Sequence, residues 1–279
     1  MTDMQGKTVV ITGATSGIGE VAAIRLAEQG ARIVHVARDR ARAEATQVAL
    51  KKANPAADHQ MHLADLSLLS EMKRVAGVIA AAEPRIDVLI DNAGALFGSR
   101  RETADGLEMT FALNHMGYFV ITNLLLPNIV DGGRIVAVAS GAHRGAKLDL
   151  DDLQLRHGFG GWRAYANSKL CNILFTRALA RRTPRGITAN CLHPGFVATR
   201  FADQTGGWTQ RLAGFAKRLS AITPEEGAKT IVYLASSPEV AGVSGQYFFE
   251  CKPATPTRAG QYDEDAERLW KLSEEIADL

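Results

Sequence analysis

A tyrosine and a lysine stand four residues apart in the stretch WRAYANSKLCN, residues 162–172. On a helix, positions i and i+4 lie one above the other, so the Tyr165 phenol and the Lys169 ammonium can reach one small region of space. A free phenol titrates near pKa ~10 and needs a nearby positive charge to release its proton at neutral pH. The pair therefore predicts acid–base chemistry at Tyr165 that is tuned by Lys169. The alternative is an ordinary surface pair.

A glycine-rich loop near the amino terminus indicates a dinucleotide site. In VVITGATSGIGEVAAIRLAEQGA an apolar run ends at Thr12, three glycines follow with the spacing G-x-x-x-G-x-G, and an alanine-rich helical pattern begins at once. Glycine permits a tight turn and lets backbone N–H groups approach a pyrophosphate at the positive end of a helix. A purely structural turn is the alternative. The loop residues expected to bind the cofactor are Gly13, Thr15, Ser16, Gly17, Ile18 and Gly19.

The end of the second apolar run favours NADP(H) over NAD(H). An acidic side chain there accepts hydrogen bonds from the ribose of NAD, whereas a basic one pairs with the 2′-phosphate of NADP. The run ARIVHVARDR offers Arg38 first, and Asp39 comes only afterwards. We expect Arg38 to read the phosphate, with Arg40 as a helper. The alternative is that Arg38 is a solvated residue at the start of the next helix.

Seven short apolar runs alternate with alanine-rich helical patterns, and this alternation indicates the elements that position these groups. The runs are KTVVIT, ARIVHVA, HQMHLA, IDVLIDNAG, GRIVAVAS, GITANCLHPG and GQYFFE. Strands that are continuously apolar are buried on both faces, as in a parallel sheet with helices on each side. We therefore expect an α/β fold: a single Rossmann-type doubly wound parallel sheet of about seven strands, forming one dinucleotide-binding catalytic domain over residues 1–279.

Two segments interrupt this pattern. Residues 141–161, GAHRGAKLDLDDLQLRHGFGG, are too glycine-rich and charged for a core and predict a loop at the carboxyl edge of the sheet. Residues 201–220 place Trp208, Leu212, Phe215 and Leu219 on one helical face. That face suits a helix packed on the domain, a substrate lid over residues 200–222, or a membrane-surface helix.

Composition limits the other functions. The 32 basic and 30 acidic side chains nearly balance, so no overall field points to nucleic acid or an anionic membrane. The three cysteines, Cys171, Cys191 and Cys251, are far apart and have no histidine cluster, which argues against disulfides and a metal site. No signal-peptide pattern and no apolar stretch of about 18 residues is found. These features predict a cytoplasmic protein without an integral membrane segment.

Six motifs together resemble those of the short-chain dehydrogenase/reductase superfamily, in order and over essentially the whole chain. They are TGATSGIG, NAG at 92–94, Asn114, Ser140, YANSK at 165–169 and HPG at 193–195. Within the superfamily, NHMGYFVITNLLLP, LHPGFVATR and the carboxyl-terminal stretch that begins SGQYFFECKPATP resemble the retinol dehydrogenase and WW-domain oxidoreductase branch.

The resemblance implies a role for each matching residue. Tyr165 is similar to the general acid/base, Lys169 to its partner, Ser140 to the anchor of the substrate carbonyl, and Asn114 to the support of a water relay. It also implies cofactor contacts from residues that follow the strands: Asp65, Leu66, Asn92, Ala93, Gly94, Pro194, Gly195, Val197 and Thr199. The long segment between Ser140 and Tyr165 departs from many members of the superfamily.

The remaining aromatic and histidine residues suggest structure more than chemistry. His143 and His157 lie in the 141–161 segment, where we expect solvent contacts or structural hydrogen bonds, and His193 could orient the Pro-Gly turn. Four further residues could be core or pocket walls: Phe97, Trp162, Phe196 and Trp208.

The resemblance implies an NADP(H)-dependent oxidoreductase that interconverts an alcohol and a carbonyl on a small, fairly apolar molecule. A redox sensor or scaffold that binds the dinucleotide without turnover is the alternative, and a lyase or epimerase is a third. Retinol itself is doubtful, because animal retinoid enzymes carry an apolar amino-terminal anchor that we do not find. The resemblance also implies a homodimer formed through the helices that contain Asn123 and Asn172.

Overall fold

The computed structural model describes residues 3–184, 186–195 and 222–279. Its strands are β1 (Thr8–Thr12), β2 (Arg32–Ala37), β3 (Gln60–Leu63), β4 (Ile86–Asp91), β5 (Ile129–Val138), β6 (Thr188–Leu192), β7 (Tyr247–Phe249) and β8 (Lys252–Ala254). Its longer helices are α1 (Gly17–Glu28), α2 (Arg40–Ala53), α3 (Leu69–Ala82), α5 (Gly117–Leu125), α6 (Gly161–Ala180), α8 (Pro224–Ser236) and α9 (Asp263–Ala277).

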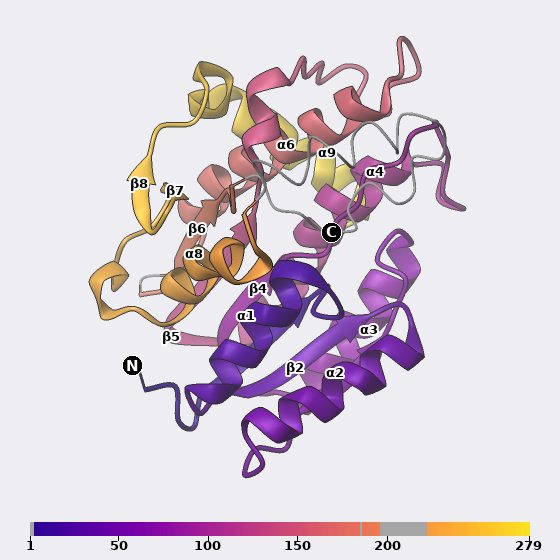
Figure 1. Cartoon of the computed structure of the whole chain (residues 1–279). Helices are drawn as coiled ribbons and strands as arrows, with labels where there is room; N and C mark the ends of the chain where they lie inside the picture. The colour runs from indigo at the N-terminus through magenta and orange to yellow at the C-terminus, as the bar shows by residue number, and fades with distance from the viewer. Residues whose placement is uncertain (1–2, 185, 196–221) are drawn as a thin grey trace.

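The strands form one sheet in the order β3-β2-β1-β4-β5-β6-β7-β8 (Figure 1). All neighbours are parallel except β7 and β8, so the expected doubly wound parallel sheet is confirmed. The order reverses direction at β1, where β2 lies on one side and β4 on the other. Ligands bind in open parallel sheets beyond the carboxyl ends of the strands at such a switch point.

The eighth strand was not expected from the sequence. It is joined to β7 by Glu250 and Cys251, whose φ angles are 49° and 60°. Two consecutive left-handed residues form the tight turn of a two-residue hairpin, which usually contains Asn or Gly. Neither residue occurs here, so the hairpin lacked its usual sequence signal.

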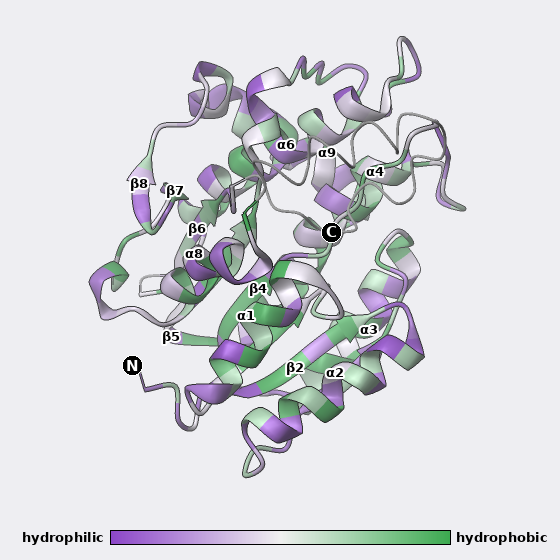
Figure 2. Cartoon of the chain, viewed as in Figure 1, coloured by the Kyte–Doolittle hydropathy of each residue, from purple (hydrophilic) through white to green (hydrophobic). Residues whose placement is uncertain are grey.

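Apolar side chains cover both faces of the sheet, and Figure 2 shows the central strands in the green of apolar residues. One core joins the sheet to α3, α5, α6 and α9, and the other joins it to α1, α2 and α8. In β1, Val9, Val10 and Ile11 are all fully buried, as expected for a strand between two helical layers. The rigid sheet therefore holds its loops in fixed positions at the carboxyl edge.

One helical stretch of the described residues, Met109–Asn128, is long and apolar enough to meet the length and composition criteria for a membrane span. Its most apolar window is 72% buried inside the fold. It comprises α4 (Met109–Phe111), the π-helical turn Ala112–Met116, α5 and the 3-10 turn Leu126–Asn128. Burial of this kind is typical of a core helix, because a helix that is apolar all round is either enclosed by protein or by lipid.

Candidate active site

Tyr165 and Lys169 lie on the same face of α6 and are 7% and 3% exposed. The alternative of a surface pair is therefore wrong. The Lys169 Nζ lies 5.8 Å from the centre of the Tyr165 ring and donates a hydrogen bond to the Val138 carbonyl at 2.8 Å. Val138 is the last residue of β5, so the strand end fixes the position of the ammonium beside the phenol.

Ser140 follows β5 and lies against the Tyr165 hydroxyl. Burial raises the pKa of Tyr165 to about 12, and a hydrogen bond between these two side chains has a smaller, opposite effect. The Ser140 Oγ also accepts a hydrogen bond from the Ala142 N–H at 3.2 Å, where it caps the 3-10 turn Gly141–Gly145. This cap leaves the serine hydroxyl proton free to donate. The geometry therefore places two hydroxyl groups where both can contact one oxygen atom.

Burial of Lys169 lowers its pKa to about 7, because a low-dielectric environment disfavours the ammonium. From the sequence, Lys169 is expected to lower the pKa of Tyr165. In this geometry burial dominates at both residues instead, which leaves the tyrosine protonated and the lysine partly charged near neutral pH. The protonation states of Tyr165 and Lys169 are therefore sensitive to any further charge that is placed in the site.

Asn114 lies in the π-helical turn Ala112–Met116, a type of distortion that is frequent at functional sites. Its Oδ1 accepts from the Ala95 N–H at 2.8 Å, and its Nδ2 donates to the Ala95 carbonyl at 2.9 Å and to the Ser168 Oγ at 3.0 Å. A Cβ on Gly94 would lie 3.1 Å from the Asn114 Oδ1 and 3.4 Å from the Lys169 Nζ. Asn114 thus holds the segment after β4 against the ammonium group.

The glycine loop joins β1 to α1 and packs tightly on the segment after β4. Gly13 has a φ of +70°, and a Cβ there would lie 2.7 Å from the Ala93 Cα. A Cβ on Gly19 would lie 2.2 Å from the Asn92 Nδ2. The same Nδ2 donates to the carbonyls of Thr12 and Gly13 at 3.0 and 2.9 Å.

Glycine is therefore required at positions 13 and 19 of this loop. Asn92 supports the loop, a role that was not expected from the sequence. Thr15, Ser16, Gly17 and Ile18 are at least partly exposed at the start of α1. The first turn of this helix is therefore open to an anionic ligand, as a dinucleotide cradle requires.

Arg38 and Asp65 lie at neighbouring strand ends, since β2 pairs with β3 in parallel. Asp39 caps α2 by accepting from the Arg42 N–H at 2.9 Å, so its carboxylate is engaged, whereas Arg38 is exposed. The Asp65 Oδ1 accepts from the backbone and hydroxyl of Ser67 at 3.0 and 2.7 Å. Leu66 beside it is buried. The structure therefore leaves Arg38 as an exposed cation at this edge and places Asp39 at the N-cap of α2.

The Pro194-Gly195 turn follows β6 and is oriented by His193, as the sequence suggested. The His193 Nδ1 accepts from the Gly195 N–H at 3.2 Å, and its ring stacks on Phe249 at a centroid distance of 4.0 Å. Gly195 has a φ of +89°, which favours glycine. Val197 and Thr199, as well as Phe196, Trp208 and residues 200–221 of the expected lid, lie outside the described residues.

The structure also places the remaining histidine and aromatic candidates. His143 is buried with structural hydrogen bonds to the Ser140 carbonyl at 2.7 Å and from the Thr257 N–H at 3.2 Å. The side chain of His157 is exposed beside Asp152, and Phe97 is buried. Trp162 is 59% exposed, with its ring 6.0 Å from that of Tyr165. Trp162 therefore lies beside the tyrosine ring and is exposed to solvent.

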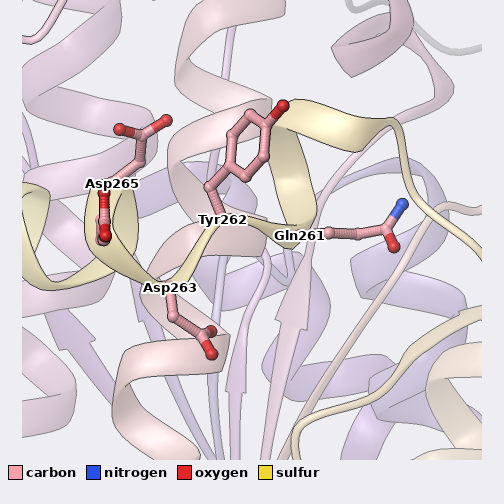
Figure 3. A pocket seen from close by; sticks show the side chains of 5 residues that line it. Gln261, Tyr262, Asp263 and Asp265 are labelled. Atoms are coloured by element: carbon pink, nitrogen blue, oxygen red, sulfur yellow. The ribbon is translucent and has the colours of Figure 1, made fainter.

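Another feature of the surface is a hollow at the start of α9 (Figure 3). It is lined by Gln261, Tyr262, Asp263, Glu264 and Asp265. Asp263 pairs with Arg177 and Arg181 of α6 at 2.8 Å. Arg177 follows Tyr165 by three helical turns, a distance of about 18 Å along the axis. The carboxylate of Asp263 is thus accounted for by the contact between α6 and α9.

The open parallel sheet, its glycine loop and the buried serine–tyrosine–lysine cluster define a class of protein: dinucleotide-binding oxidoreductases. The short chain dehydrogenase family matches residues 7–210, and the chain belongs to this family. It therefore acts on alcohol or carbonyl groups with a nicotinamide cofactor.

Similar proteins agree with this assignment. Mouse retinol dehydrogenase 14 is 39% identical, with 97% of this chain and 86% of that protein covered. Human WW domain-containing oxidoreductase is 36% identical, with coverage of 98% and 69%. The resemblance to this branch is thus confirmed. A solved structure of an uncharacterised protein from Mycobacterium paratuberculosis has 32% identity and a TM-score of 0.81, covering 100% and 96% of the two chains. A Burkholderia cenocepacia short chain dehydrogenase in complex with NADP has 26% identity and a TM-score of 0.70, with coverage of 88% and 96%.

Proposed function

We propose that the protein is an NADP(H)-dependent oxidoreductase that interconverts an alcohol and a carbonyl on a small, fairly apolar molecule. The observation that carries this proposal is the contact of the Ser140 and Tyr165 hydroxyls beside the buried Lys169. The cofactor, when bound, supplies or accepts the hydride. The residues that fit it are the glycine loop, Asn92 to Gly94, Arg38, Asp65, Leu66, Pro194 and Gly195; Val197 and Thr199 belong to the same prediction.

In the reductive direction, Tyr165 gives its proton to the substrate oxygen as negative charge develops there. Ser140 donates a hydrogen bond to the same oxygen and so stabilises that charge. The ammonium of Lys169 stabilises the resulting phenolate. Asn114 keeps the Gly94 segment in place beside this ammonium group. In the oxidative direction the same groups remove the proton from the alcohol.

The preference for NADP(H) is supported by the exposed Arg38 and the engaged Asp39. Titration of cofactor fluorescence measures the Kd for NADPH and NADH in the wild type, in Arg38→Ala and in Lys52→Ala, an exposed control at the far end of α2. We expect the Kd for NADPH to rise about tenfold in Arg38→Ala and to stay unchanged in the control. Tighter binding of NADH by the wild type contradicts this assignment.

The substrate is proposed as an apolar ketone or aldehyde, because the open surface beside Tyr165 carries the exposed Trp162. A panel with aliphatic, aromatic and isoprenoid carbonyls, including retinaldehyde, tests this class. Binding of NADPH without turnover of any carbonyl or alcohol supports the redox sensor instead. Turnover without a net change in NADPH absorbance indicates a lyase or epimerase.

The single catalytic domain, the cytoplasmic location and the homodimer remain predictions. Three free cysteines support a reducing compartment, which cell fractionation tests. The proposed dimer helices, α5 and α6, are contacted by α9, since Trp270 stacks on Phe175 at 5.8 Å and meets Phe119 edge-on at 4.9 Å. A dimer through these helices has to form around α9. Light scattering of the purified chain measures the mass directly.

A further inference from the structure

The Val138 carbonyl is a shared acceptor at the centre of the site. It accepts from the Lys169 Nζ at 2.8 Å, from the Tyr118 hydroxyl at 3.3 Å and from the Asn172 Nδ2 at 3.5 Å. A carbonyl oxygen has two lone pairs, so three donors exceed what it can serve well. The shortest of the three hydrogen bonds is the one from the catalytic lysine.

Tyr118 contacts the same ammonium in a second way. It is 1% exposed and lies on α5, and the centre of its ring is 5.3 Å from the Lys169 Nζ. An aromatic face at this distance attracts a cation. Tyr118 therefore touches both ends of the hydrogen bond that holds Lys169, with its ring at the ammonium and its hydroxyl at the acceptor.

Asn172 is also held in place. It lies on α6 and is fully buried near the ring of His115; burial lowers the pKa of that histidine to about 3, and the Asn172 side chain has a smaller, opposite effect. The other side of the ring is fixed, because the His115 Nε2 lies 2.9 Å from the Ser273 Oγ of α9. Packing of the ring against Phe111 and Phe175 adds to this support. The Asn172 Nδ2 thus approaches the Val138 carbonyl from a buried position that does not involve Lys169.

We propose that Tyr118 and Asn172 are positioning residues that keep the Val138 carbonyl hydrogen-bonded when Lys169 turns away from it toward Tyr165 and the bound cofactor. A buried carbonyl that loses its partner carries a large desolvation penalty, which opposes the movement of the lysine. Donors already at the carbonyl remove most of that penalty. This inference rests on the proposed function, because it requires Lys169 to act on the cofactor side of the site.

A double-mutant cycle on NADPH affinity tests the proposal. The four proteins are the wild type, Tyr118→Phe, Lys169→Met and the double variant, and fluorescence titration gives the Kd for NADPH in each. Tyr118→Phe keeps the ring and removes only the hydroxyl. We expect it to raise the Kd about fivefold in the wild-type background and to leave it unchanged in the Lys169→Met background. The control Tyr233→Phe lies on α8, over the other face of the sheet, and should leave the Kd unchanged.

An equal effect of Tyr118→Phe in both backgrounds overturns the proposal, because it shows a structural role that does not act through Lys169. No effect in either background overturns it as well. Asn172→Leu, tested in the same cycle and checked for folding by circular dichroism, provides a second route if Tyr118→Phe does not fold. If the wild type binds neither NADPH nor NADH, the proposed function is wrong. If the wild type binds NADPH but Tyr118 and Lys169 are not coupled in the cycle, only the present proposal is wrong.

Discussion

The ammonium of Lys169 donates to the Val138 carbonyl at 2.8 Å while its nitrogen lies 5.8 Å from the centre of the Tyr165 ring. The end of β5 therefore holds the lysine beside the phenol that it is expected to tune. Because the ammonium is buried, its pKa falls to about 7, which places its change of charge in the physiological range.

The first prediction concerns the pH dependence of cofactor binding. A dinucleotide is anionic and binds better to the charged form of Lys169, and the free protein loses that charge as the pH rises through about 7. We expect the Kd for NADPH to increase above pH 7 by up to about tenfold per pH unit. The same titration on Lys169→Met should lack this step. A pH profile shared by both proteins assigns the titration to another group.

A second prediction concerns the glycine loop. Gly19→Ala places a Cβ 2.2 Å from the Asn92 Nδ2 and 2.5 Å from the Gly13 carbonyl oxygen, so the loop has to move. We expect a loss of NADPH binding and a destabilisation of at least about 2 kcal/mol by overpacking. Gly77→Ala is the matched control, because it lies on α3 with no atom within 4 Å of the added Cβ. It should stabilise the protein by up to about 1 kcal/mol, as alanine does in helices. Urea unfolding with and without NADPH measures both, and equal behaviour of the two variants would falsify the close packing described here.

A third prediction concerns Asp91, which is fully buried at the end of β4. Burial raises its pKa to about 8, although the Thr122 hydroxyl donates to its Oδ2 at 2.7 Å. An unfolded aspartate titrates near 3.8. Since the folded pKa is the higher one, folding keeps a proton that the unfolded chain releases, and stability falls as the pH rises from about 4 to 8.

The variant Asp91→Asn has no such proton. Between pH 5 and 7 we expect the free energy of unfolding of the wild type to fall by about 2–3 kcal/mol relative to this variant. Urea unfolding at each pH gives the difference between the two proteins and cancels the groups that they share. Parallel pH curves would show that Asp91 ionises in the fold.

Local sequence signals were sufficient for most of the fold, and they predict the residues of the site. Continuous apolar runs placed the strands, and the i, i+4 spacing placed Tyr165 and Lys169 on one face of α6. The glycine spacing located the loop at β1. Each of these signals depends on a few neighbouring residues, which is why they could be interpreted without a structure.

Other features depend on residues that are distant in the chain. Asn92 reaches back to the carbonyls of Thr12 and Gly13, and Tyr118 meets Val138 only because α5 packs on β5. Nothing around position 118 marks it as part of a site, since an aromatic residue in an apolar helix is typical of a core. The hairpin at Glu250 and Cys251 lacks the usual turn residues, and the balance of burial and charge at Lys169 depends on packing.

The central claim is that Tyr165 transfers the proton while the rest of the site holds the cofactor, and Tyr165→Phe tests it most directly. The variant removes one hydroxyl from a buried ring. Stopped-flow absorbance of NADPH with a carbonyl that the wild type reduces gives the rate of turnover, and fluorescence titration gives the Kd. We predict a loss of about 10³-fold in kcat with a Kd for NADPH within about twofold of the wild type. Retention of wild-type turnover by Tyr165→Phe would contradict the account.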